Sequence, residues 1–293
     1  MIKFILLFFV TFTALASHRE DAQVLLNRFE AFHPIEMRID YISQGFLGLP
    51  YGKGGPLGEG PDGRYDQDPL YRFDTFDCTT FVETVISLAL TQNVDAFEAK
   101  MNEIRYEDSN IDYLRRNHFP SLQWIPNNIQ NGIFKEVNSL ILPQSERKIV
   151  DSVINLPGWL KAIKLDEIKT PFATLEERQS LLEELHSFSG QYSPVAIQLE
   201  YLPISTLLKK PKVLSRIPHG SIINFVRPNW DLADAIGTHM NVSHQGFVIQ
   251  KKSGTYLRHA STTGAVMENA LIDYLKKFEN HPTLKGIHLL QLN

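Results

Sequence analysis

The chain carries one cysteine and ten histidines, and three of these residues are spaced in a way that could support nucleophilic chemistry. Cys78 follows a Gly- and Pro-rich stretch and precedes an apolar pattern of helical period. His244 and His259 stand on either side of the turn-forming stretch KKSG. A thiol becomes a nucleophile when a base takes its proton or its surroundings stabilise the thiolate. The pattern therefore predicts a cysteine nucleophile served by imidazole.

Cys78 is predicted to begin a helix. Apolar residues recur from this position at i, i+3, i+4, i+7 and i+8, and Asp77 or Thr75 can cap the start. The first turn of a helix presents N–H groups without intrahelical partners and the positive end of the dipole. Both features stabilise a thiolate and can hold an oxyanion. The alternative is that Cys78 is only the first core position of this helix, because it belongs to the apolar stripe.

The residues 243–250 and 255–261 are predicted to form a hairpin with both histidines on one face. If Gln250 pairs with Ser253, His244 lies directly opposite His259, with Cβ atoms about 5 Å apart. One imidazole would then act as the general base and the other would orient it. A different turn would separate the two rings. A structural histidine pair and a Cys–His–His zinc site are the alternatives.

The surrounding elements indicate an α+β fold, because helices come first and an antiparallel sheet follows. We expect residues 17–92 to form the N-terminal helical part of a catalytic core, with the nucleophile and a long polar loop at 49–74. Residues 93–215 are expected to be a helical insertion, with a capping box at Thr174 and Glu177. Residues 216–293 are expected to supply the sheet. Strands are predicted at 220–226, 243–250, 255–261 and 286–292, and a short helix at 269–278.

Residues 1–16 are interpreted as a cleaved signal peptide. Lys3 supplies a positive charge, an apolar run of about 12 residues follows, and Ala14 and Ala16 give the small-x-small pattern of a cleavage site. A bilayer-spanning helix needs roughly 20 apolar residues, so this run is too short to be one. We therefore expect an exported protein, periplasmic or secreted, with no membrane contact after cleavage. A membrane anchor or a buried first helix is the alternative.

Composition excludes several classes of partner. With 43% hydrophobic residues and a net charge of −4, the chain can build a core but has no basic field for nucleic acid. One cysteine cannot supply a zinc site built from several thiolates, and a lone exported thiol is inert, paired between chains or reactive. We expect no metal, no cofactor and a monomeric chain.

Three segments resemble, in order, the motif set of the NlpC-like cysteine peptidases, which hydrolyse amide bonds in bacterial peptidoglycan. These segments are DCTTF at 77–81, SHQGFVIQ at 243–250 and RHAS at 258–261. FLGLPYGKGG is similar to the Tyr-containing segment before the family's nucleophile, and IPHGSIINF to the strand that enters its sheet. The DCTTFVET wording and the long insertion resemble the N-acetylmuramoyl-L-alanine amidase-like branch, over most of the mature chain.

The resemblance implies a papain-like core, in which a nucleophile at a helix N-terminus packs on an antiparallel sheet. By position, Cys78 is the nucleophile, His244 the general base and His259 the residue that orients it. Tyr51 would lie near the oxyanion, with Asp77 and Thr79 as further substrate-binding positions.

One departure from the family pattern bears on specificity. Thr80 stands where many members of the superfamily have Gly, and it adds bulk next to the nucleophile. This departure puts endopeptidase specificity in doubt and fits the amidase branch better. Gln245 also replaces an apolar residue, but it is expected to face away from the site.

The function implied is a cysteine amidase that cleaves the N-acetylmuramoyl-L-alanine bond of peptidoglycan fragments through a thioester. Soluble anhydro-muropeptides are the expected substrates, and no cofactor is needed. Three alternatives remain. They are a γ-D-glutamyl-diamino acid endopeptidase, an acyltransferase on the same scaffold, and a catalytically inactive cell-wall-binding protein.

Overall fold

The computed structural model describes residues 18–28, 34–53, 55 and 57–293, and the expected signal peptide lies outside them. The chain forms two compact units. The first comprises the described residues up to Arg116 together with Ala260–Val266, and the second comprises Asn117–His259 and Met267–Asn293. Helices and antiparallel strands are both present, which confirms the α+β class. Among the described residues, no helix has the length and apolarity to cross a membrane.

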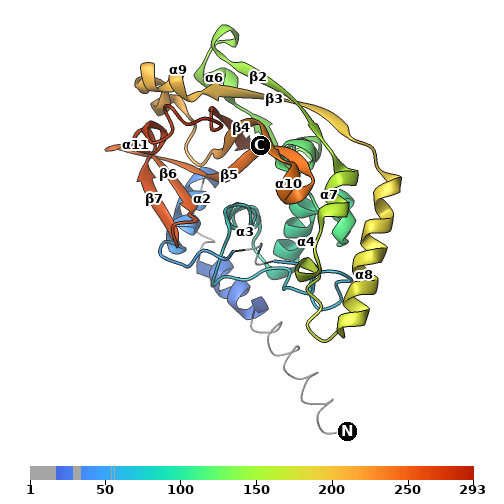
Figure 1. Ribbon diagram of the computed structural model, residues 1–293. Coiled ribbons are helices and arrows are strands. Elements are labelled where there is room, and N and C mark those ends of the chain that lie inside the picture. Colours follow the sequence, from blue (N-terminus) through green and yellow to red (C-terminus); the bar gives the residue numbers. More distant parts are fainter. Residues whose placement is uncertain (1–17, 29–33, 54, 56) are drawn as a thin grey trace. The chain divides into compact units, whose positions relative to one another are not determined.

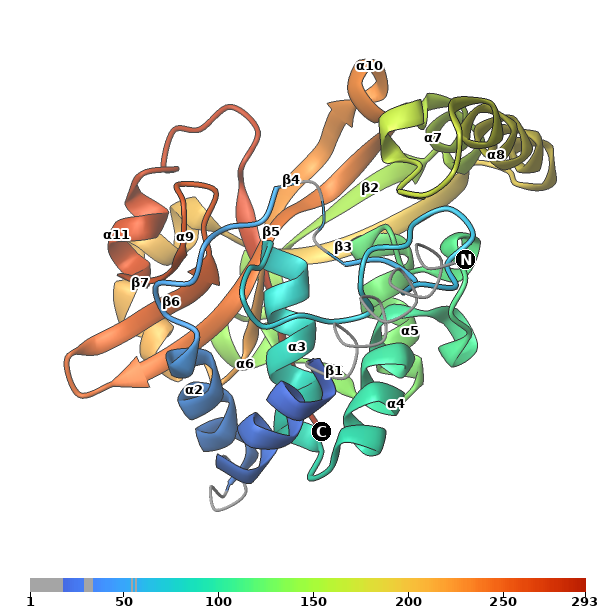
Figure 2. The same ribbon diagram turned by 90° about the horizontal axis from the view of Figure 1, so that it is seen from below.

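Three helices form the centre of the first unit. They are α2 (Ile35–Gly45), α3 (Cys78–Leu90) and α4 (Val94–Arg105), and α3 packs against the other two (Figure 2). Helix α3 begins at Cys78, as the apolar periodicity predicts. It is buried on more than its apolar stripe, because Glu83, Thr84 and Ser87 are buried with the hydrophobic positions. The position of Cys78, the first residue of α3, is therefore fixed because the rest of this helix is buried inside the unit.

A buried ion pair joins α3 to α4. Arg105 Nε donates to Glu83 Oε2 at 2.9 Å, and the two side chains are 1% and 4% exposed. The same guanidinium donates through Nη1 to the carbonyl of Leu70 at 2.5 Å. Because a buried charge is strongly destabilising without its partner, this pair couples both helices to the loop that leads to Cys78.

An antiparallel sheet organises the second unit (Figure 1). Along the sheet the order is β2-β3-β8-β4-β5-β6-β7, and β1 pairs with β8. The strand bounds are β1 Phe134–Glu136, β2 Lys148–Ile154, β3 Val195–Pro203, β4 Ile222–Leu232, β5 Thr238–Lys251, β6 Gly254–Ala260, β7 Val266–Ala270 and β8 Gly286–Leu292.

Three short helices of the second unit contribute buried residues to a core on one face of this sheet. The α-helices of the unit are α5 (Ile125–Gln130), α6 (Asn138–Ile141), α7 (Leu156–Ala162), α8 (Leu175–Ser187), α9 (Ile204–Lys209), α10 (Ala233–Ile236) and α11 (Leu271–Lys276). The core includes Phe225, Val248 and Leu257 from the strands and Leu271 and Leu275 from α11. Since these strand residues alternate with residues of the other face, the sheet presents two distinct surfaces.

The segment 93–215, expected to be a helical insertion, also supplies the strands β1, β2 and β3, which the sequence did not indicate. In β2 the side chains of Ile149 and Val153 are 60% and 48% exposed, while Val150 and Ile154 are buried. Apolar residues on both faces remove the apolar–polar alternation that identifies a strand. The capping box of Thr174 and Glu177 at the start of α8 is confirmed.

The face of the sheet opposite the core carries a buried polar ladder. Gln245 Nε2 donates to Asn224 Oδ1 at 2.7 Å, and Asn224 Nδ2 lies 3.1 Å from His288 Nδ1. His288 Nε2 in turn lies 3.1 Å from Glu136 Oε1. Gln245 is therefore a buried structural residue whose side chain points to the face opposite His244.

The Glu83–Arg105 pair gives a stability prediction. Glu83→Leu leaves a buried guanidinium without its carboxylate, so the free energy of unfolding should fall by about 3–5 kcal/mol. Glu103→Gln removes a partly exposed i,i+3 partner of Lys100. This change should alter the free energy of unfolding by less than about 1 kcal/mol. Denaturant unfolding measures both, and equal effects would contradict the role given to the buried pair.

Candidate active site

The start of helix α3 is held by a reciprocal cap. Asp77 Oδ1 accepts a hydrogen bond from the Thr80 backbone N–H at 2.7 Å, and Thr80 Oγ1 accepts one from the Asp77 N–H at 3.0 Å. Cys78 is the first helical residue, and its Sγ lies 4.0 Å from Thr79 Oγ1. Thr80 thus completes the capping box that fixes the backbone around Cys78. From the sequence alone, only the bulk of this residue was considered.

Tyr51 lies beside this helix start. Its segment forms a parallel bridge with Phe76, and Gly52 N donates to the Phe76 carbonyl at 2.9 Å. Burial, followed by the negative charges of Cys78 and Asp77, raises the pKa of Tyr51 to about 12. The phenol therefore keeps its hydrogen at neutral pH and remains a hydrogen-bond donor near the thiol.

The second unit brings His244 and His259 into contact on one face of the hairpin. His244 Nε2 lies 2.5 Å from His259 Nδ1. The register that would place the two rings directly opposite each other is not the one observed, because Gln250 pairs with Thr255 and Lys251 with Gly254. The turn is therefore a two-residue connection, the commonest hairpin type. In this register the two histidines meet diagonally across the strands instead of directly opposite each other.

Two backbone features make the diagonal contact possible. His244 pairs with Phe225 and Val242 with Val226, so Ser243 is an extra residue in a β-bulge. Bulges redirect neighbouring side chains, and this one directly precedes His244. At Gly246, an added Cβ would lie 2.9 Å from the Cβ of His259. A side chain at that position would displace the His259 ring.

The imidazole pair sits against the core and is uncharged at neutral pH. Burial, followed by the neighbouring His259, lowers the pKa of His244 to about 3. Burial also lowers the pKa of His259 to about 4, against the opposing effect of a hydrogen bond to Asn269. That contact joins His259 Nε2 and Asn269 Oδ1 at 3.2 Å. Tyr274 packs on the His259 ring with a centroid distance of 5.2 Å.

Asn269 is the member of this cluster that sequence reasoning missed. The sequence places Asn269 at the start of a predicted helix, whereas it lies in strand β7 and the helix α11 begins at Leu271. A short strand next to a helix gives little periodicity to detect. The predicted residues thus form two groups, with Tyr51, Asp77, Cys78 and Thr79 in the first unit and His244 and His259 in the second.

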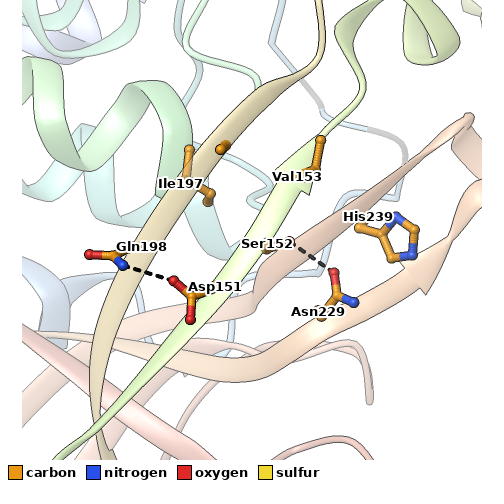
Figure 3. A pocket seen from close by; sticks show the side chains of 8 residues that line it. Asp151, Ser152, Val153, Ile197, Gln198, Asn229 and His239 are labelled. Carbon is orange, nitrogen blue, oxygen red and sulfur yellow. Dashed lines mark hydrogen bonds between the residues drawn. The ribbon is translucent and has the colours of Figure 1, made fainter.

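A separate cavity of about 690 Å³ lies in the second unit (Figure 3). Gln198 Nε2 donates to Asp151 Oδ1 at 2.8 Å, and Ser152 Oγ donates to Asn229 Oδ1 at 3.0 Å. None of the site residues expected from the sequence lines this cavity. In the part of the chain that the structure describes, no three His, Cys, Asp or Glu residues are grouped so that they could hold a metal ion.

These features define an α+β protein with a thiol at a capped helix start and, on a hairpin, a partly buried His244 in contact with a buried His259. Residues 41–284 match the AmiA-like family, described as N-acetylmuramoyl-L-alanine amidase-like. The chain belongs to this family, as its DCTTFVET segment suggests. Membership indicates a hydrolase with a peptidoglycan-related substrate.

Several solved structures share the fold of this chain. A Legionella pneumophila protein of the DUF1460 family is 33% identical with a TM-score of 0.90, over 94% of this chain and 95% of its own. An N-acetylmuramoyl-L-alanine amidase from Bacteroides uniformis is 22% identical with a TM-score of 0.63, over 88% and 99%. A Bacteroides fragilis protein described as a candidate xylanase is 27% identical with a TM-score of 0.59, over 85% and 98%. Comparison with curated proteins gave no match.

The histidine pair predicts how stability depends on pH. Both folded-state pKa values are depressed, so below the ordinary value of about 6.5 the unfolded chain binds more protons than the folded one. The free energy of unfolding should therefore fall as pH falls from about 6.5 towards 4, by about 1.4 kcal/mol per pH unit for each histidine. Denaturant unfolding at pH 7, 6 and 5 measures this slope. His259→Asn should reduce this slope, and an unchanged slope would contradict burial of a neutral His259 ring.

Proposed function

We propose that the protein is a cysteine amidase that hydrolyses the N-acetylmuramoyl-L-alanine bond of peptidoglycan fragments. In this proposal Cys78 is the nucleophile, His244 the general base and His259 the residue that orients it. The scaffold is proposed to be a papain-like core of the NlpC-like type. The protein is proposed to act as an exported monomer, periplasmic or secreted, without a cofactor.

The observation that carries the proposal is the neutral imidazole pair, in which a partly buried His244 contacts a buried His259. An uncharged imidazole that donates through Nε2 to a second ring has Nδ1 left to take a proton. The chain has a single cysteine, and it begins a capped helix with a protonated Tyr51 nearby. A nucleophile, a base and an orienting group are the three parts that acyl transfer requires.

The first half of the proposed reaction forms a thioester. His244 Nδ1 takes the proton of Cys78 as Sγ attacks the carbonyl carbon between the lactyl group of muramic acid and L-alanine. The tetrahedral oxyanion receives hydrogen bonds from the backbone N–H of Cys78 and from the Tyr51 hydroxyl. His244 then gives its proton to the departing amine, the C–N bond breaks, and the peptide leaves.

The second half restores the enzyme. His244 removes a proton from water, and the hydroxide attacks the thioester carbonyl. The C–S bond breaks, the muramic acid carboxylate is released, and the thiol regains its proton. Soluble anhydro-muropeptides are the proposed substrates.

Digestion of muropeptides tests the proposal directly. The protein should release the stem peptide from anhydro-muropeptides and leave a sugar without peptide, as measured by mass spectrometry. Cys78→Ala should abolish release, because no other thiol is present in the chain. Thr91→Ala, at the C-cap of the same helix, serves as a control that retains Cys78.

The masses of the products separate the alternatives. A dipeptide left on the sugar would indicate a γ-D-glutamyl-diamino acid endopeptidase. A shortened glycan that keeps its peptide would indicate glycoside cleavage. Release that persists in Cys78→Ala would refute the nucleophile, and no turnover by the wild type would favour an inactive binding protein.

Tyr51 provides a test of the oxyanion site. Tyr51→Phe removes one hydrogen-bond donor and keeps the ring, so kcat should fall about 10²-fold with little change in KM. Tyr41→Phe alters a tyrosine on helix α2 and should leave kcat unchanged. Steady-state kinetics on a purified muropeptide measures both, and a pure KM effect for Tyr51→Phe would assign this residue to ground-state binding instead.

A further inference from the structure

We propose that Asn269 is a positioning residue that sets, through His259, the tautomer of His244 and so reserves Nδ1 of His244 as the proton acceptor. The kinetic consequence rests on the proposed function, whereas the tautomer assignment does not. All three side chains belong to the second unit.

The argument begins at the amide oxygen. Asn269 Oδ1 lies 3.2 Å from His259 Nε2, and an amide oxygen can only accept a hydrogen bond. Nε2 of His259 must therefore carry the hydrogen. A neutral imidazole has one N–H, so His259 Nδ1 presents a lone pair.

The lone pair determines the next ring. His259 Nδ1 lies 2.5 Å from His244 Nε2, and a lone pair requires a donor opposite it. Nε2 of His244 must carry the hydrogen, which leaves Nδ1 unprotonated. Two hydrogen bonds in series thus connect the Asn269 amide, through His259, to His244 and determine that Nδ1 of His244 is the basic nitrogen.

Protonation of His259 would reverse this arrangement. A doubly protonated His259 directs Nδ1–H at His244, which must then accept through Nε2 and hold its hydrogen on Nδ1. The base would be lost although His244 itself had not changed its charge. Activity therefore requires His259 to stay neutral, and its burial at 1% exposure favours that state.

The groups that face His259 from its neighbouring elements agree with a neutral ring. Strand β5 presents His244, strand β7 presents the uncharged Asn269, and α11 packs Tyr274 against the ring. Lys277, directly after α11, adds a positive charge that opposes a second proton on His259. None of these named groups carries a negative charge at neutral pH.

Histidine tautomers in the ¹⁵N-labelled protein test the proposal by NMR. In the wild type, His259 and His244 should both carry hydrogen on Nε2. In Asn269→Leu the acceptor is absent, so both rings should populate a mixture of tautomers, and kcat should fall about tenfold with KM unchanged. His288, on the opposite face of the sheet, should keep its signals and serves as an internal reference.

A conservative variant separates this role from a merely structural one. Asn269→Asp keeps the acceptor, so the tautomers should persist. The carboxylate should favour protonated His259, however, and so shift the acid limb of the kcat/KM profile to higher pH by about one unit or more. Asp273→Asn, an exposed position on α11, should change neither the tautomers nor the profile. If Asn269→Leu does not fold, the wild-type spectrum and Asn269→Asp carry the test.

Hydrogen on His244 Nδ1 in the wild type would overturn the proposal. Unchanged tautomers in Asn269→Leu would also overturn it. Failure of the proposed function gives a different result, because turnover would then be absent in the wild type or would persist in Cys78→Ala, while the NMR assignment stood.

Discussion

The contact between the two imidazoles is the interaction on which the proposed chemistry of this protein depends. It places a nitrogen of the partly buried His244 ring 2.5 Å from a nitrogen of the buried His259 ring within the second unit. Such a contact is stable only if one nitrogen carries a hydrogen and the other does not. Burial enforces that condition by keeping both rings neutral. In the proposed mechanism, this contact defines which nitrogen of His244 accepts the proton before any substrate binds.

The sheet supports this contact with local departures from regular geometry. The bulge at Ser243 turns His244, and the missing side chain at Gly246 gives His259 the room to approach diagonally. The two faces of the sheet are used differently. One face holds the imidazole pair against the apolar core, and the other holds the Gln245–Asn224–His288 ladder. Neighbouring residues in β5 therefore serve separate polar networks.

The sequence predicted those features that depend on local pattern. The start of α3 at Cys78 followed from the apolar period and the Asp77 cap, and the shared face of the histidines followed from strand alternation. Features that depend on tertiary packing were missed. The register differed because the two turn residues are Lys252 and Ser253 and not Lys251 and Lys252, and β2 was hidden by apolar side chains on both of its faces. Asn269 gave no signal, because its role arises only from contact with His259.

The central claim is that the Cys78 thiol gives its proton to His244. The rate of alkylation of Cys78 by iodoacetamide between pH 5 and 9 tests it most directly, because the chain has no other thiol. The account predicts rapid alkylation near pH 6.5, well below the ordinary thiol pKa of about 8.5. His244→Asn should slow it at least tenfold at that pH, while His239→Asn should not. Identical rate profiles for the wild type and His244→Asn would contradict the account.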